Sequence, residues 1–210
     1  MFKSLLALLL ALATSAALAV NPEVVRLQQD WAEIKYKQPK NQQEQKFSAL
    51  LKIAEETASK AQNDPEVLIW YGIIEASYAG VRGGLGALGH VKNAKKSFER
   101  AIEIKPSALD GSAFTSLGSL YYQVPGWPIG FGDNKKALEF LKKGLAANPD
   151  GIDPNFFYGY FLFKSGDFAG ADQALKKALG AAPRPGRELA DEGRRSEIDA
   201  LLVKITEKKK

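Results

Sequence analysis

Apolar residues recur along this chain at intervals of three and four, the spacing of one face of an α-helix. Three segments share a more specific pattern: an alanine, a large apolar residue four positions on, a small residue three further, and a proline five beyond it. They are Ala94-Phe98-Ala101-Pro106, Ala137-Leu141-Gly144-Pro149 and Ala171-Leu175-Ala178-Pro183. Small residues let a neighbouring helix approach closely, and each proline ends its helix. The pattern predicts three helices, each packed against a partner.

The partner helices are predicted immediately upstream. Phe114-Leu117-Gly118-Tyr121 and Tyr158-Gly159-Leu162 mark two of them, and Leu68-Tyr71-Gly72 is a shifted match. We expect the glycine of the first two to lie at the tightest contact inside its helix pair. No alternating pattern of useful length predicts a strand.

These paired helices resemble the tetratricopeptide repeat family, whose unit is a helix–turn–helix of about 34 residues. The last unit, about 152–185, fits without gaps, with Gly166-Asp167-Phe168 at the expected turn. Successive prolines lie 34 residues apart from Pro149 to Pro183, but 43 from Pro106 to Pro149 and 41 from Pro65 to Pro106. We expect the extra residues between the paired helices, mostly at 80–92 and 124–134.

The resemblance implies an all-α, right-handed solenoid of about four helix pairs closed by a C-terminal capping helix. The pairs are expected at about 22–64, 65–106, 107–149 and 150–185, the first of them degenerate with residues 39–42 as its loop. The capping helix is expected at 187–208, and together they form a single domain over 20–210. The residues of the capping helix that we expect to be buried are Leu189, Ile198, Leu201, Leu202 and Ile205. A solenoid needs such an element because its last repeat otherwise exposes an apolar flank.

The first 19 residues have the pattern of a secretory signal peptide. Lys3 precedes an apolar run over 5–13, and Ala17-Leu18-Ala19 forms a small-x-small cleavage site. Cleavage after Ala19 would place residues 20–210 in the periplasm or outside the cell. The alternative is an uncleaved anchor, since the run approaches membrane-spanning length. No later stretch of the sequence is apolar enough to span a membrane.

Composition argues against catalysis. The chain has 210 residues, a formal charge of +5 at pH 7, no cysteine and one histidine. Without cysteine there is no disulfide, no thiolate zinc site and no lipobox lipid anchor. A hydrolase using the carboxylates of Glu66, Glu75 and Asp133 is an alternative, but their spacing does not support a pair. We therefore expect no enzyme, no cofactor and no metal.

Several other motifs have ordinary explanations. The G-x-G-x-x-G string at 84–89 follows a predicted helix rather than a strand, so it predicts a flexible loop and not a dinucleotide site, with His90 solvated beside it. Asp153-Pro154 is typical of an N-cap followed by the first helical residue. The three positions Arg187, Asp191 and Arg195 are spaced by four, which predicts mutual pairing on an exposed face. The late basic residues lack interleaved aromatics, so nucleic-acid binding is not expected.

Two groups of residues are candidates for partner binding. In the family that this chain resembles, the first helix of each pair lines a concave groove for a peptide or partner helix. When these groove positions are transferred to the equivalent helix positions of this sequence, the resemblance implies a groove that includes Tyr122, Gln123, Phe156, Tyr160, Phe163 and Lys164. The second group is the apolar loop at 124–134, which contains Trp127 and Phe131. The Trp127 side chain either fills the groove between its own helices or forms a rigid contact for a partner.

We therefore expect an exported, non-enzymatic protein that binds a protein or peptide partner. A helical-repeat protein with glycine-rich insertions and a closing helix also resembles the T component associated with TRAP-type transporters. That resemblance implies an extracytoplasmic solute-binding protein as partner, and a homo-oligomer with a ligand-conducting pore. The alternative is a docking factor for envelope or polysaccharide-export assembly.

Overall fold

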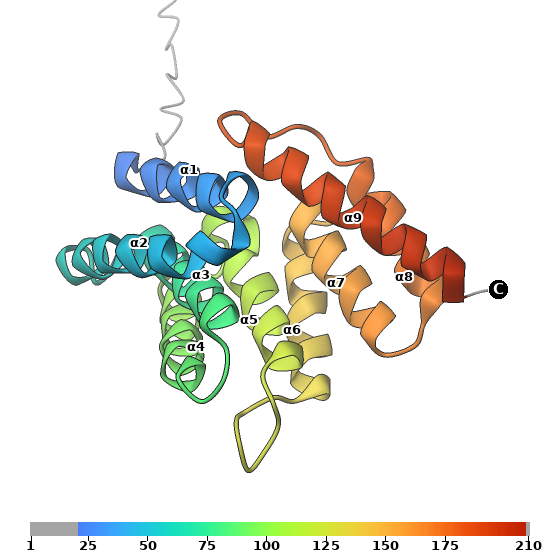
Figure 1. Ribbon diagram of the computed structural model, residues 1–210, viewed down its shortest axis with the longest axis horizontal. Coiled ribbons are helices and arrows are strands. Elements are labelled where there is room, and N and C mark those ends of the chain that lie inside the picture. The colour runs from blue at the N-terminus through green and yellow to red at the C-terminus, as the bar shows by residue number, and fades with distance from the viewer. Residues whose placement is uncertain (1–20, 209–210) are drawn as a thin grey trace, which may run out of the picture.

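The computed structural model describes residues 21–208, so the predicted signal peptide and the cleavage site at Ala19 lie outside the described residues. Nine α-helices and one short 3-10 helix follow one another, and no strand occurs over 21–208 (Figure 1). Their bounds are α1 Pro22–Lys37, α2 Lys40–Lys60, α3 Pro65–Arg82, α4 Ala87–Ile104, η1 Ala108–Gly111, α5 Ser112–Gln123, α6 Asn134–Ala147, α7 Ile152–Lys164, α8 Phe168–Leu179 and α9 Glu188–Lys208. Sequential helices pack in pairs, which confirms the predicted all-α solenoid with a capping helix.

Side-chain caps explain where four of the helices begin. Asn21, Asp64, Asp133 and Asp167 each accept hydrogen bonds from backbone N–H groups in the first turn of α1, α3, α6 and α8. In α1 and α3 the next residue is proline, which suits the first helical position because no backbone N–H is needed there.

The predicted small residues lie where paired helices touch. A Cβ atom added to the glycine of the first helix would overlap the large apolar residue of the second. The distances would be 2.6 Å from Gly72 to Phe98, 2.8 Å from Gly118 to Leu141 and 2.9 Å from Gly159 to Leu175. The same kind of close contact therefore occurs in three helix pairs, including α3 and α4, where the sequence match at Gly72 is shifted.

The connections differ from the predictions in two places. The expected insertion at 80–92 is mostly helical, because α3 continues to Arg82 and α4 begins at Ala87, which leaves only 83–86 as a loop. The added turns bury part of Val81 and Val91 against neighbouring core residues, which favours helix over loop. The first connection is likewise shorter than 39–42, since α2 begins at Lys40 directly after Pro39. The second expected insertion is a true loop between α5 and α6.

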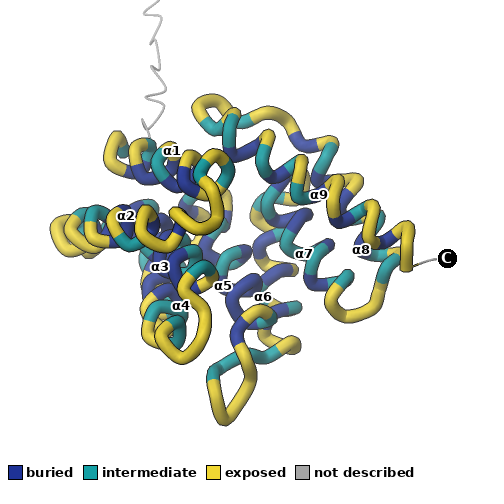
Figure 2. The backbone as a smooth tube through the Cα atoms, viewed as in Figure 1, coloured by how far each residue is buried: buried dark blue, intermediate teal, exposed yellow. Residues whose placement is uncertain are grey.

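Buried side chains form three successive clusters along the stack. In Figure 2 the buried stretches of backbone are dark blue, and they lie where helices face one another. Helix α9 buries Ile198, Leu201 and Ile205 in the last cluster, against α7 and α8, as the capping prediction requires. The first turn of α9 contacts the first cluster as well. Ala190 is buried in that cluster with residues of α1, α2 and α3, and Leu189 packs against it.

The two ends of the stack are joined by this contact between α1 and α9. Figure 1 shows that α9 begins beside α1 and runs back across the stack towards α8. Gly193 of α9 lies so close to the Tyr36 ring of α1 that a Cβ there would overlap it. The Tyr36 hydroxyl donates to Glu197 at 3.4 Å, and the Lys35 ammonium lies 3.6 Å from the same carboxylate. None of the helices over 21–208 is long and apolar enough to cross a membrane.

Candidate functional site

A cavity of about 1510 Å³ occupies the concave side of the stack. The first helix of each pair (α1, α3, α5 and α7) and α9 supply most of its walls, and α2 and α4 contribute a few residues each. Eight aromatic residues line it: Trp31, Tyr36, Phe47, Trp70, Phe98, Phe156, Phe157 and Tyr160. Nine charged residues also line it, six of them cationic. Such a preformed concavity with aromatic walls suits a ligand with apolar groups.

The residues that sequence reasoning placed in the groove divide into two sets. Gln123, Phe156 and Tyr160 line the cavity. Tyr122, Phe163 and Lys164 are not among its lining residues. Tyr122 lies between α5 and α7, with its ring 5.9 Å from that of Tyr160 and 5.7 Å from that of Phe161.

The other two residues lie behind the cavity wall or in solvent. The Phe163 ring stacks on Tyr160 at 6.4 Å and contacts Phe168 at 5.7 Å. Lys164 is exposed near the end of α7. Helical periodicity predicts that these residues lie near the groove. It cannot distinguish residues that line the groove from residues that pack between neighbouring repeats.

The loop between α5 and α6 holds its shape through its own backbone. The amide of Gly132 donates to the Pro125 carbonyl at 2.9 Å, and the amide of Asp133 donates to the Tyr121 carbonyl at 2.9 Å. Phe131 packs edge-on against the Tyr121 ring at 5.6 Å. Trp127 is 90% exposed, so it does not fill the groove between its own helices. The loop therefore presents Trp127 outwards from a well-packed base.

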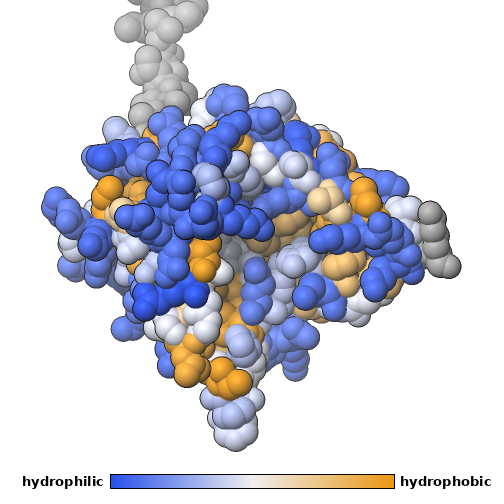
Figure 3. Space-filling model, in the orientation of Figure 1, coloured by the Kyte–Doolittle hydropathy of each residue, from blue (hydrophilic) through white to orange (hydrophobic). Residues whose placement is uncertain are grey.

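Apolar side chains gather at this end of the molecule, which we call the apolar end (Leu85, Trp127 and Ile129). Four large apolar side chains are exposed among residues 21–208, and three of them are here: Leu85 at 80%, Trp127 at 90% and Ile129 at 58%. Figure 3 shows the apolar surface over the α3–α4 turn and the α5–α6 loop. Leu85 and Ile129 also line the cavity, so the apolar end borders it. Clustered exposed apolar groups mark interaction sites on soluble proteins.

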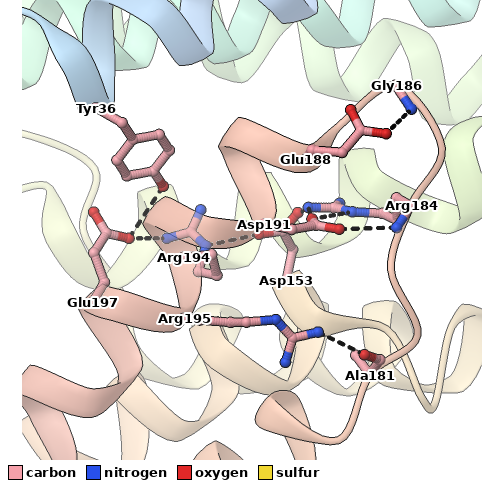
Figure 4. A network of polar contacts seen from close by, with 10 residues as sticks. All are labelled: Tyr36, Asp153, Ala181, Arg184, Gly186, Glu188, Asp191, Arg194, Arg195 and Glu197. Atoms are coloured by element: carbon pink, nitrogen blue, oxygen red, sulfur yellow. Dashed lines mark hydrogen bonds and ion pairs between the residues drawn. The ribbon is translucent and has the colours of Figure 1, made fainter.

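An ion-pair network holds α9 to α7 and to the segment before α9 (Figure 4). The Arg184 guanidinium donates to Asp153 at 2.7 Å and to Asp191 at 2.5 Å. The Arg194 guanidinium donates to Asp153 at 2.9 Å and to Glu197 at 2.6 Å. Asp153 therefore bridges two arginines, and the expectation that it is an N-cap is wrong, because Gly151 occupies the N-cap of α7.

The electrostatics of Asp153 follow from these contacts. Burial alone would raise its pKa, but the guanidinium groups of Arg194 and Arg184 outweigh burial and hold the pKa well below its usual range. The Arg194 guanidinium also lies 4.2 Å from the centroid of the Phe156 ring, which joins the network to the cavity wall. Asp153 therefore stays ionised under ordinary conditions.

The predicted mutual pairing of Arg187, Asp191 and Arg195 is also wrong. Asp191 is buried and bound to Arg184, while Arg195 donates to the backbone carbonyls of Leu179 and Ala181. Regular spacing of four suggested an exposed helix face, but this face of α9 packs on α7 and α8. The Arg187 guanidinium instead lies 5.0 Å from the Trp70 ring centroid, beside the cavity.

The carboxylates proposed for a hydrolase serve separate structural roles. Glu75 is buried and accepts hydrogen bonds from Tyr71 at 2.8 Å and Asn93 at 3.0 Å. The His90 ring is also within 2.6 Å of Glu75, so the expectation of a solvated loop histidine is wrong. Asp133 caps α6, and Glu66 lies in the first turn of α3. Within residues 21–208 no group of three or more histidine, cysteine, aspartate or glutamate side chains is arranged to hold a metal.

Comparison with known proteins agrees with the helix pairs. Family models described as tetratricopeptide repeat match residues 85–107 and 129–190. Both matched segments carry tetratricopeptide repeats. The longer match extends from the α5–α6 loop into the start of α9, and the shorter one covers α4. No curated protein matches the chain at a significant level.

A solved tetratricopeptide-repeat structure shares this fold. TTC0263, a thermophilic protein of this repeat class from Thermus thermophilus, aligns with a TM-score of 0.57 and 22% identity, over 88% of this chain and 89% of that one. A MamA protein aligns with a TM-score of 0.45 and 18% identity, over 89% and 92% of the two chains. MamA 41-end from Desulfovibrio magneticus RS-1 has a TM-score of 0.44 and 18% identity, over 90% and 96%.

Proposed function

We propose that this protein is a non-enzymatic scaffold that docks a protein partner at the apolar end and along the adjoining cavity. The observation that carries the proposal is the exposure of Trp127 on a loop whose base is packed and hydrogen-bonded. An exposed tryptophan held in one place binds at little entropic cost, and tryptophan is enriched at binding hot spots. Tetratricopeptide repeats serve as protein-binding scaffolds, which agrees with this use.

We further propose that the protein is exported and works as the T component of a TRAP-type transporter, with an extracytoplasmic solute-binding protein as its partner. The signal-peptide pattern at 1–19, the glycine-containing connections and the closing helix α9 support this assignment. A homo-oligomer belongs to the same proposal. The alternative partner is envelope or polysaccharide-export machinery, which would use the same docking surface.

Crosslinking in the native envelope followed by partner identification tests both parts of the proposal. We expect the wild-type chain to capture a solute-binding protein. The double variant Trp127→Ala/Ile129→Ala should reduce capture by about tenfold or more, because removed hot-spot side chains typically cost over about 1.4 kcal/mol each. Val203→Ala is the matched control, since Val203 is also exposed, at 58%, but lies on α9.

The outcomes separate the possibilities. Recovery of assembly machinery without a solute-binding protein would refute the transporter assignment. Undiminished capture by the double variant would show that the apolar end does not dock the partner. Tyr160→Ala then tests the cavity alone, because Tyr160 lines the cavity away from the exposed loop. Far-ultraviolet circular dichroism of each variant checks that helicity is retained.

A further inference from the structure

One guanidinium group beside the cavity has no counter-ion among residues 21–208. The network at α9 contains three carboxylates and three cations that pair with one another: Asp153, Asp191 and Glu197 with Arg184, Arg194 and Lys35. Arg187 stands outside this set and forms no ion pair with any residue of the described chain. The cavity lining as a whole is cationic, with six lysine and arginine side chains against three carboxylates.

The polar atoms around this charge are unsatisfied as well. The Nε atom of Arg187 and the Nε1 atom of Trp70 are both buried without a hydrogen-bond partner among the described residues. Both side chains line the cavity, and the Trp70 side chain is only 3% exposed. Burial lowers the pKa of Arg187 and the neighbouring Arg184 lowers it further, while the carboxylates of Asp153 and Asp191 offset part of that effect without forming an ion pair. Buried donors without acceptors are costly, but neither of these two atoms is open to a ligand. The terminal N–H groups of Arg187 also form no hydrogen bond with a described residue, and they are the donors that an acceptor in the cavity can reach.

We propose that the cavity binds a free carboxylic acid with an apolar body, and that Arg187 holds its carboxylate beside Trp70. A carboxylate supplies a negative charge for this guanidinium, and its two oxygens match the fork of the terminal N–H groups of Arg187. A doubly charged phosphate would cost more than a carboxylate to desolvate against the apolar walls.

The rest of the cavity fits the apolar body of such a molecule. Ile73, Leu109 and Phe157 line it together with Trp31, and the contact between α1 and α9 closes the stack near Arg187. Aromatic and aliphatic walls favour an alkyl chain or a ring over a polar substituent. This site rests on the proposed function only in that both use the same cavity. Docking at the apolar end does not depend on a bound acid, because the apolar end lies away from Arg187.

Isothermal titration calorimetry of the purified chain, with no partner protein, tests the site. Octanoate and octan-1-ol are the probes, since they share the alkyl chain and differ in the charged group. We expect octanoate to bind about tenfold or more tightly than octanol, because a hydrogen-bonded charge contributes at least about 1.5 kcal/mol. Arg187→Met should remove that preference while leaving octanol binding unchanged, which also shows that the cavity is still folded.

Arg100→Met is the matched control, because Arg100 is exposed on α4 and pairs with Glu103 outside the cavity. It should keep the preference for octanoate. Equal binding of the two probes by the wild-type chain, or undiminished octanoate binding by Arg187→Met, would refute the site. If octanoate does not bind but an apolar peptide with a free C-terminus binds better than its amidated form, the assignment to a free acid is wrong. Neither result affects partner capture through Trp127.

Discussion

Replacing Asp153 by asparagine tests how strongly the network holds α9 to α7. The two carboxylate oxygens accept hydrogen bonds from Arg184 at 2.7 Å and from Arg194 at 2.9 Å. Asparagine keeps the shape but removes the charge, and its NH₂ group must face one of the guanidinium groups. Removing one partner of a buried ion pair costs about 3–5 kcal/mol. Arg184 keeps Asp191 and Arg194 keeps Glu197, so we expect a smaller loss of about 2–3 kcal/mol in the free energy of unfolding.

The same residue sets a pH dependence. The pKa of Asp153 is lower in the folded protein than in the unfolded chain, so the unfolded chain binds the extra proton as the pH falls. The stabilisation is complete above the unfolded pKa of about 4 and is lost as the pH falls from about 5 towards the folded pKa. The difference in stability between the wild-type chain and Asp153→Asn should therefore shrink between pH 7 and pH 3, by about 1 kcal/mol or more.

Urea unfolding followed by circular dichroism at pH 7 and pH 3 measures both effects. Asp150→Asn is the matched control: its side chain is 86% exposed and pairs with Lys177 at 3.1 Å on the surface. An exposed pair of this kind contributes less than about 1 kcal/mol. If Asp153→Asn and Asp150→Asn lose the same stability, or if the wild-type advantage over Asp153→Asn is unchanged at pH 3, the network does not hold α9 as we argue.

Three further substitutions test the packing of the stack. Gly118→Ala should lower the free energy of unfolding by about 1–3 kcal/mol, because its Cβ would lie 2.8 Å from Leu141; urea unfolding measures this. Gly80→Ala, in open space within α3, should raise it by up to about 1 kcal/mol in the same assay, and a loss there would contradict the assigned helix. Gly193→Ala should separate α9 from the Tyr36 ring and increase hydrogen exchange in both α1 and α9, whereas unchanged exchange in α1 would refute the contact.

The repeat core was predictable from sequence because close packing restricts residue type. Ala94, Ala137 and Ala171 are each fully buried where a neighbouring helix approaches, and a larger side chain would not fit. Spacing of small and large residues therefore identifies both the helices and their contact faces. The family comparisons confirm that interpretation for 85–107 and 129–190.

The ion-pair network was not predictable from local patterns. Asp153 and Arg194 are 41 positions apart, and nothing near Asp153 in the sequence shows that an arginine of α9 will reach it. An aspartate followed by proline is common at helix N-caps, and charges spaced by four are common on exposed helix faces. Local sequence therefore favours a cap at Asp153 and an exposed face for Asp191, and both predictions are wrong. A useful signal was the excess of arginine between 184 and 195, because buried ion pairs favour arginine over lysine.

The contact between α1 and α9 changes what the concave face can do. In an open solenoid each repeat touches only its neighbours, so the width of the groove varies as small rotations add along the stack. Here Tyr36 and Glu197 link the first repeat to the capping helix, and Arg194 links that helix to α7. The cavity walls are therefore fixed at both ends before any ligand arrives, which lowers the entropic cost of binding. The same closure makes the distant ends depend on each other, so a substitution at Gly193 is expected to alter the cavity without touching its aromatic wall.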